Sequence, residues 1–297
     1  MFYSSKEKEI AKKVFPRAVV SFFRKIVYPE KLNLIEKNLN SLFCQHYQKI
    51  AAPDTDQKTA FKNAEFKVCS KVGEDGLILY IFSKVGTVNH TFVEFGVEEG
   101  RECNTANLSL NFGWRGLLVD AGKEDIEKAK AFYGARSCKA KPVHCFITAE
   151  NVNQLLKDNG FQGEIDLFSM DIDGNDYWVF KALNAINPRV IVAEYNASLG
   201  LRPITMKYNP DFHYQSDLYF GASLTALTKL ANVKGYILIG CDSNGHDAFF
   251  VRKDAAQGKF AELSPEKAFY PNPHLIQKFG GLEEQFNKIK HLEFIHV

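Results

Sequence analysis

Acidic and amide side chains that could do chemistry follow two apolar runs of the sequence. Asp171 and Asp173 come directly after Leu167-Phe168-Ser169-Met170, and Glu194 and Asn196 come at the end of another run. Side chains alternate along a strand, so Asp171 and Asp173 would share a face. If the two runs are neighbouring parallel strands, all four side chains meet at the carboxyl edge of a sheet, where ligands bind.

Two kinds of chemistry suit this group. Asp171 could act as a general base for a substrate hydroxyl, because a carboxylate among other carboxylates gains affinity for protons. Alternatively, Mg²⁺, which prefers hard oxygen ligands, could be held by Asp171, Asp173, Glu194 and Asn196. A simpler interpretation is that Asp173 or Asn175 caps the following helix. His213, in a later loop, could be a base, a metal ligand or a plain surface residue.

A glycine turn precedes this acidic segment. Gly96 and Gly100 would let the backbone approach a ligand closely. Glu94 could bind the amino-acid end of a cofactor or hold the loop. Asp120 ends the next apolar run, where an acidic residue is placed to bind ribose hydroxyls. The alternative is an ordinary strand–helix–strand turn capped by acids.

Regular alternation of apolar runs and helical periods must position these residues. It predicts an α/β fold: a Rossmann-like, doubly wound, mostly parallel seven-stranded sheet that ends in an antiparallel hairpin. The expected strands cover residues 91–96, 115–121, 141–147, 165–173, 190–195, 236–241 and 248–252. The expected helices cover residues 102–111, 123–133, 149–159, 177–183 and 221–233. Residues 203–219 show no periodicity and suggest a functional loop.

Three parts are expected: an N-terminal helical arm (1–60), the main domain (61–253) and a C-terminal helical extension (254–297). Within the arm, residues 12–25 are basic and amphipathic. They could make a peripheral contact with an anionic membrane. They could equally cover the main domain or a partner subunit in a homo-oligomer.

Composition narrows the classes of function. The net charge of +2 and a pI near 8.1 do not suggest nucleic-acid binding, for which a strongly basic domain is expected. No apolar run approaches the roughly 18 residues of a membrane span. The six cysteines form no Cys-x-x-Cys pair, which favours a reducing compartment. We therefore expect a cytoplasmic protein, with membrane contact only at its periphery.

The chain resembles class I S-adenosylmethionine-dependent methyltransferases, and within them the FkbM-like group. The resemblance covers residues 70–253 and is carried by Val93-Glu94-Phe95-Gly96 with Gly100, Leu118-Val119-Asp120, Ser169-Met170-Asp171-Ile172-Asp173-Gly174, Val192-Ala193-Glu194 and Ala248-Phe249-Phe250-Val251-Arg252. One departure is Glu98, which stands where the cofactor loop usually has a glycine.

The resemblance implies O-methylation of a hydroxyl on a sugar, glycan or related small molecule, with S-adenosylmethionine as cofactor. It implies that Glu94, Gly96 and Asp120 contact the cofactor and that Asp171 faces the reaction centre. Asp75, in Gly73-Glu74-Asp75-Gly76, matches a loop that lies near the cofactor in related proteins.

Two other classes of function remain open. An NAD-dependent oxidoreductase could use a similar fold, although the missing Gly-x-Gly-x-x-Gly and the closing hairpin count against it. A non-catalytic module that docks to a membrane or partner is the other alternative. The polar cluster at the strand ends counts against this second alternative, because such clusters are costly without a ligand.

Overall fold

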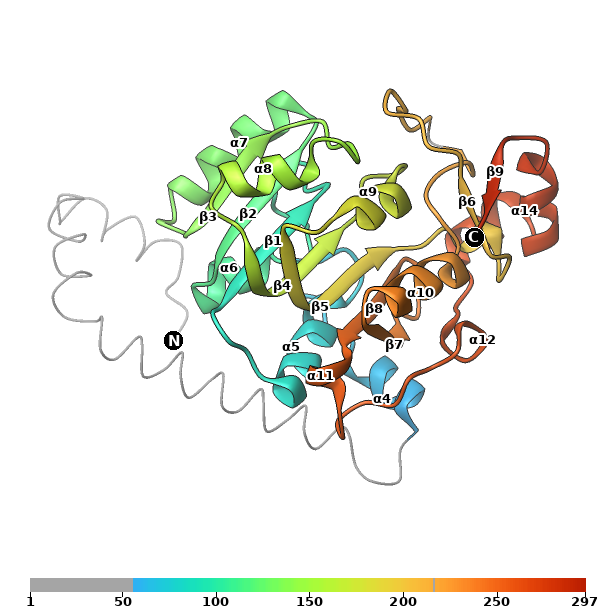
Figure 1. Cartoon of the computed structure of the whole chain (residues 1–297), viewed down its shortest axis with the longest axis horizontal. Helices are drawn as coiled ribbons and strands as arrows, with labels where there is room; N and C mark the ends of the chain where they lie inside the picture. Colours follow the sequence, from blue (N-terminus) through green and yellow to red (C-terminus); the bar gives the residue numbers. More distant parts are fainter. Residues whose placement is uncertain (1–55, 216) are drawn as a thin grey trace, which may run out of the picture. The chain divides into compact units, whose positions relative to one another are not determined.

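The computed structural model describes residues 56–215 and 217–297, which belong to one compact unit. The main sheet contains β1 (Thr91–Phe95), β2 (Arg115–Asp120), β3 (Ala140–His144), β4 (Gly163–Met170), β5 (Ile186–Glu194), β7 (Tyr236–Cys241) and β8 (Asp247–Arg252). Its strand order is β3-β2-β1-β4-β5-β8-β7 (Figure 1). Only β8 runs antiparallel to the other six strands, which confirms the predicted Rossmann-like sheet with a closing hairpin.

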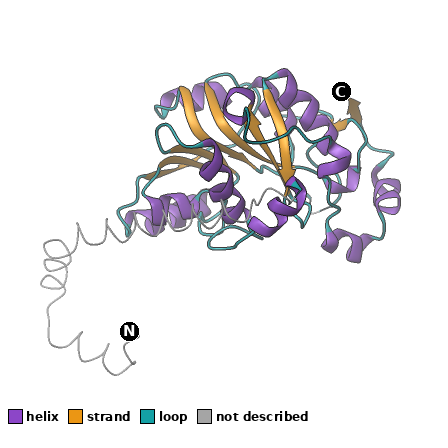
Figure 2. Ribbon diagram, turned by 90° about the horizontal axis from the view of Figure 1, so that it is seen from below, coloured by secondary structure: helices purple, strands orange, loops and turns teal. Residues whose placement is uncertain are grey.

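Helices cover both faces of this sheet (Figure 2). The helices of the described residues are α4 (Gln57–Ala64), α5 (Glu74–Val85), α6 (Ala106–Phe112), α7 (Lys123–Gly134), α8 (Val152–Asp158), α9 (Asp176–Ala182), α10 (Leu224–Val233), α11 (Lys253–Ala256), α12 (Pro265–Ala268), α13 (Pro273–Phe279) and α14 (Leu282–Ile289), with the 3₁₀ helix η1 (Ala197–Leu199). Alternate strand residues form one core with α8, α9 and α10. On the other face, Phe61 of α4 packs edge-on against Phe249 of β8 and Tyr80 of α5.

Several elements differ from the expectation. Strand β4 ends at Met170 rather than at residue 173, so Asp171 and Asp173 lie beyond the strand and strand alternation does not place them on one face. Helix α5 was not predicted, and the Gly73–Gly76 segment is not a loop but leads into its first turn. Helix α6 begins at Ala106 rather than at residue 102. A small second sheet pairs β6 (Ile204–Met206) with β9 (Phe294–His296), inside regions expected to be irregular and helical. Strands of three residues have no periodicity to detect, and their partners lie far apart in sequence.

The expected N-terminal arm falls almost entirely outside the described residues, and this includes the basic segment 12–25. Helix α4 spans the expected boundary at residue 60 and belongs to the same compact unit as the sheet. Among the described residues, no helix is long and apolar enough to span a membrane.

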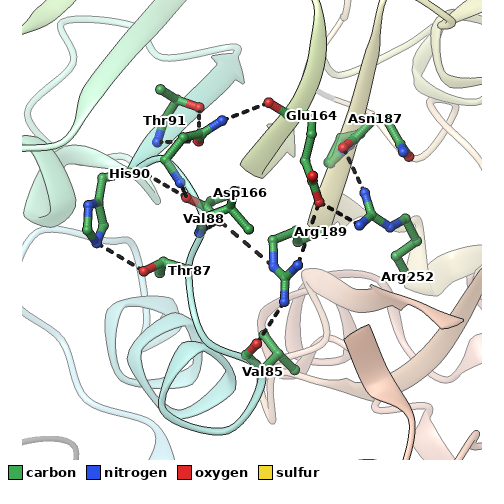
Figure 3. A network of polar contacts seen from close by, with 12 residues as sticks. Val85, Thr87, Val88, His90, Thr91, Glu164, Asp166, Asn187, Arg189 and Arg252 are labelled. Carbon is green, nitrogen blue, oxygen red and sulfur yellow. Dashed lines mark hydrogen bonds and ion pairs between the residues drawn. The ribbon is translucent and has the colours of Figure 1, made fainter. Parts of the chain in front are cut away.

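A polar network closes the amino-terminal edge of the sheet (Figure 3). The fully buried carboxylate of Asp166 in β4 accepts hydrogen bonds from the backbone N–H groups of Val88, Asn89 and His90 at 2.6–2.9 Å. The Arg189 guanidinium lies 3.9 Å from the same carboxylate and donates to the carbonyl oxygen of Val85 at 2.8 Å. The network therefore ties the segment before β1 to the starts of β4 and β5.

Candidate functional site

A pocket of about 280 Å³ opens at the opposite, carboxyl-terminal edge of the strands. It brings together Gly96, Asp120, Asp171, Asp173 and His213, all of which the sequence had singled out. The other lining residues are Lys71, Glu98, Ala121, Cys145, Phe146, Ile147, Ile172, Gly174, Asn175, Phe212 and Tyr214. Four carboxyl groups thus face the pocket, against one lysine and one histidine.

Gly96 lets the loop after β1 approach the end of β4. A Cβ atom at this position would lie 1.5 Å from the carbonyl oxygen of Asp171, and the backbone has a φ of +77°. Any other residue would push the two strand ends apart. Gly100 has a different role, since it packs under Tyr133, whose hydroxyl donates to the Gly100 carbonyl oxygen at 2.6 Å. Gly100 therefore shapes the loop and does not line the pocket.

Glu94 holds this loop from below. Its buried carboxylate accepts hydrogen bonds from the backbone N–H groups of Asn104 and Thr105 at 2.8 and 2.9 Å, and from the Thr105 hydroxyl. Burial raises the pKa of Glu94, although these hydrogen bonds oppose the rise. Glu94 also lines a smaller pocket of about 70 Å³, so a contact with the amino-acid end of a cofactor stays a prediction. Its contacts show that it holds the loop. They also explain the late start of α6, because the segment before it wraps around Glu94.

Asp120 lies where a ribose-binding acid is expected. Its carboxylate accepts from the backbone N–H groups of Glu98 at 2.8 Å and Gly122 at 2.6 Å, which fixes its direction at the pocket wall. Glu98 has a φ of +48°, in the left-handed region that glycine usually occupies. Glu98 therefore has a backbone conformation that favours glycine, and this strained residue faces the pocket.

Asp171, Asp173 and Glu194 form an acidic triad. Each offers one carboxylate oxygen, and these oxygens lie within 4.8 Å of one another. Burial, together with the neighbouring Asp173, raises the pKa of Asp171 to about 7. Burial and the nearby Asp176 raise the pKa of Asp173 to about 6, and burial with Asp171 raises that of Glu194 well above its usual value. The triad is thus poised to share a proton or to bind a cation.

Asn196 does not join the triad, in contrast to the expectation. It is fully buried, and its amide donates to the carbonyl oxygens of Leu218 and Phe220 at 2.9 Å. Its side-chain oxygen accepts from the Ser198 N–H at 2.9 Å. Its amide group is therefore used to fasten the long loop after β5.

The helix-capping alternative is not realised at α9. Asn175 makes no side-chain cap bond; instead its side chain exchanges hydrogen bonds with the backbone of Asn209 in the long loop. Asp176 accepts from the N–H groups of Ile172 and Gly174, which leaves Asp173 free to face the pocket. Asp173 also has a positive φ of +51°, so a second strained residue lies at this site.

The long loop covers one side of the pocket with aromatic rings. The exposed His213 packs against Phe146, with ring centroids 5.1 Å apart, and Phe212 packs over Gly174. Phe212 also lines a second cavity of about 530 Å³, together with Met206, Lys207, Tyr208, Asn209, Pro210, Tyr219, His291, Leu292 and Glu293. His213 is therefore placed as a wall of the first pocket, beside the cavity that the loop shares with the C-terminal segment.

Lys71 lines the pocket and was not singled out from the sequence. It lies on the loop before α5, which Asp75 holds through hydrogen bonds to the N–H groups of Val68, Cys69 and Ser70. Asp75 itself is buried in these contacts and does not line the pocket, unlike the role that the resemblance implied. The signal for Lys71 was indirect: it stands two residues before Gly73-Glu74-Asp75-Gly76, whose acids fold the loop back.

No protein-family model matches the chain, and no curated protein matches it. Among solved structures, it is similar to an S-adenosylmethionine-dependent methyltransferase from Clostridium acetobutylicum ATCC 824, with 13% identity, 71% of this chain and 98% of that chain covered, and a TM-score of 0.40. It is also similar to an O-methyltransferase from Bacillus cereus in complex with SAH, with 13% identity, coverage of 78% and 95%, and a TM-score of 0.38. Because these TM-scores lie below 0.5, the fold rests on the strand order alone.

Proposed function

We propose that the chain is an S-adenosylmethionine-dependent O-methyltransferase. The observation that carries the proposal is the acidic pocket at the carboxyl edge of a Rossmann-like sheet, with Asp120 at the end of β2, where a ribose-binding acid is expected. S-adenosylmethionine bears a positive sulfonium and a positive ammonium, which the carboxylates of this pocket would attract.

The same pocket is poorly suited to a dinucleotide, the cofactor of the oxidoreductase alternative. A pyrophosphate needs free backbone N–H groups after the glycine turn and at the start of the next helix. Here the N–H groups of Asn104 and Thr105, which lead into α6, are already bound by the Glu94 carboxylate. Two phosphate charges would also face Asp120, Asp171 and Asp173.

Asp171 is the residue that we assign to proton removal. The cofactor would supply a methyl group activated by its sulfonium charge. An alcohol attacks well only as it loses its proton, and a base works best when its pKa is near the working pH. The Asp171 pKa of about 7 meets this condition, and Asp173 and Glu194 lie close enough to stabilise the proton once it is transferred.

The acidic triad also fits a divalent cation, because three hard oxygen ligands converge there. In that arrangement Asp171, Asp173 and Glu194 would hold Mg²⁺, which would lower the pKa of the acceptor hydroxyl. Removal of divalent ions with EDTA separates the two versions: activity that persists assigns proton removal to Asp171 alone.

The acceptor that we propose is a hydroxyl of a sugar or glycan. The cavity of about 530 Å³ beside Phe212 offers the rings of Tyr208 and Tyr219 next to polar groups of Asn209 and His291. Aromatic faces with polar groups at their edges suit a sugar ring, which has apolar CH faces and hydroxyl edges. The long loop would position the acceptor, and His213 would close the cofactor side.

Titration calorimetry of the full chain with S-adenosylhomocysteine and with NADH tests the proposal. We expect micromolar binding of the first ligand and none of the second. Asp120→Asn should weaken S-adenosylhomocysteine about tenfold or more, because it removes a charge-assisted bond to the ribose. Asp158→Asn, at the exposed end of α8, is the matched control and should change nothing. Binding of NADH alone, or of neither ligand by the folded chain, would contradict the proposal.

A further inference from the structure

The loop that carries Lys71 is held in a fixed shape by two buried acids in the first turn of α5. Asp75 accepts three backbone N–H bonds from residues 68–70, and one oxygen of Glu74 accepts from the N–H groups of Val72 and Gly73 at 2.9 and 2.8 Å. The Ser70 hydroxyl donates to Asp75 as well. So dense a set of bonds on either side of Lys71 fixes where its side chain leaves the backbone.

Lys71 lines two adjoining pockets at once. One is the pocket of about 280 Å³ described above, and the other is a smaller pocket of about 70 Å³ that also contains Asp247 and Asn104. The two pockets share Gly96 and Asp171. The smaller pocket therefore continues the larger one past the glycine loop, on the side away from Asp120 and Phe146.

The Lys71 ammonium and several carboxylates line the smaller pocket, but they form no ion pair. Among the described residues, no carboxylate lies within 4.0 Å of the Lys71 ammonium. Burial lowers the pKa of Lys71, but several carboxylates, led by Asp171 and Glu194, outweigh it and leave the pKa above its usual value. Asp247 is 6% exposed and has one hydrogen bond from the Asn104 amide at 3.0 Å.

An ammonium and carboxylates that line one pocket without an ion pair between them match a ligand group that carries both charges. An α-amino acid group is such a zwitterion, and it would bridge the gap with its carboxylate toward the lysine and its ammonium toward the acids. Building on the proposed function, we propose that Lys71 binds the carboxylate of the cofactor's amino-acid end, while Asp247 receives its ammonium.

This assignment makes Lys71 a specificity-determining residue. The adenosine part would bind between Asp120 and Phe146, and only ligands with an amino-acid end would reach Lys71. 5′-Methylthioadenosine has the adenosine and sulfur of the cofactor but lacks that end. The wild-type chain should therefore bind S-adenosylhomocysteine more tightly than 5′-methylthioadenosine.

Calorimetry of the full chain with both ligands tests the assignment. Lys71→Ala should weaken S-adenosylhomocysteine about 10- to 100-fold and leave 5′-methylthioadenosine unchanged, because only the first ligand loses a charge-assisted contact. Lys71→Arg should recover part of the loss. The control is Lys62→Ala, at an exposed position of α4 outside both pockets, which should bind both ligands like the wild type.

An equal effect of Lys71→Ala on both ligands, or no effect on either, would overturn the assignment while leaving the proposed function intact. Failure of the wild-type chain to bind either ligand would instead contradict the proposed function and, with it, this assignment. Thermal unfolding of each variant confirms that the chain is folded.

Discussion

Strand β4 carries an aspartate toward each of its ends, and the fold treats the two in opposite ways. At the amino-terminal edge, Asp166 has three backbone N–H donors and Arg189 beside it. At the carboxyl-terminal edge, Asp171 has two other carboxylates beside it, and its pKa is raised to about 7. Repelling carboxylates are relieved by a proton, a cation or a positively charged ligand group, so the carboxyl-terminal edge is where a ligand is expected.

The largest effect that we expect comes from the amino-terminal edge of the sheet. Asp166→Asn would place an amide NH₂ against backbone N–H donors and remove the charge next to Arg189. The free energy of unfolding, measured by urea denaturation, should fall by about 3 kcal/mol. Glu164→Gln, at the exposed rim of the same network, should cost less than about 1 kcal/mol. Equal losses for both variants would show that burial of Asp166 is not the cause.

Asp171→Asn should act in the opposite direction on stability. It removes one of three repelling carboxylates, so the free energy of unfolding at pH 8 should rise on the order of 1 kcal/mol. Methyl transfer should fall about 100-fold or more, because the proposed base is lost. A clear decrease in the free energy of unfolding would contradict the view that the three carboxylates repel one another in the folded chain.

The increase in the free energy of unfolding caused by Asp171→Asn should depend on pH. The pKa values of Asp171 and Asp173 are raised to about 7 and about 6, so the folded chain holds more protons than the unfolded chain between about pH 4 and 7. Their contribution to stability is therefore present at low pH and lost as pH rises through 6 and 7. Urea denaturation from pH 5 to 8 should show that the free energy of unfolding of the variant increases relative to that of the wild type as pH rises. A difference that does not change with pH would exclude carboxylate repulsion as the cause.

The smallest effect concerns backbone strain beside the triad. Glu98→Gly should relieve the cost of a φ of +48° but add backbone entropy to the unfolded chain. We expect a net gain of a few tenths of a kcal/mol in the free energy of unfolding. A loss above about 1 kcal/mol would mean that the Glu98 side chain itself stabilises the loop.

The sequence predicted the sheet well because its signals are local. Buried parallel strands appear as apolar runs, and Asn244-Gly245 marks the turn of the closing hairpin. The positions of Gly96, Asp120, Asp171 and Asp173 at the pocket follow from their places at strand ends. The carboxyl ends of parallel strands lie at the same edge of a sheet, so residues at these ends lie near one another whichever way their side chains point.

The directions of single side chains could not be predicted in this way. Glu94 turns toward Thr105, Asn196 toward Leu218, and Asp75 toward Ser70, and each choice depends on a loop with no periodic pattern. Lys71 reaches the pocket only because Glu74 and Asp75 fold its loop back. Such contacts are decided by hydrogen-bond satisfaction in three dimensions, which spacing along the chain does not encode.

The most direct test of the account is a crystal structure of the full chain grown with S-adenosylhomocysteine. We expect the ribose hydroxyls on Asp120, the sulfur near Gly96 and Asp171, and the amino-acid end beside Lys71. A ligand bound elsewhere, or a pocket between Asp120 and Asp171 that stays empty at saturating ligand, would contradict the central claim that the acidic carboxyl-terminal edge is the methyltransferase site.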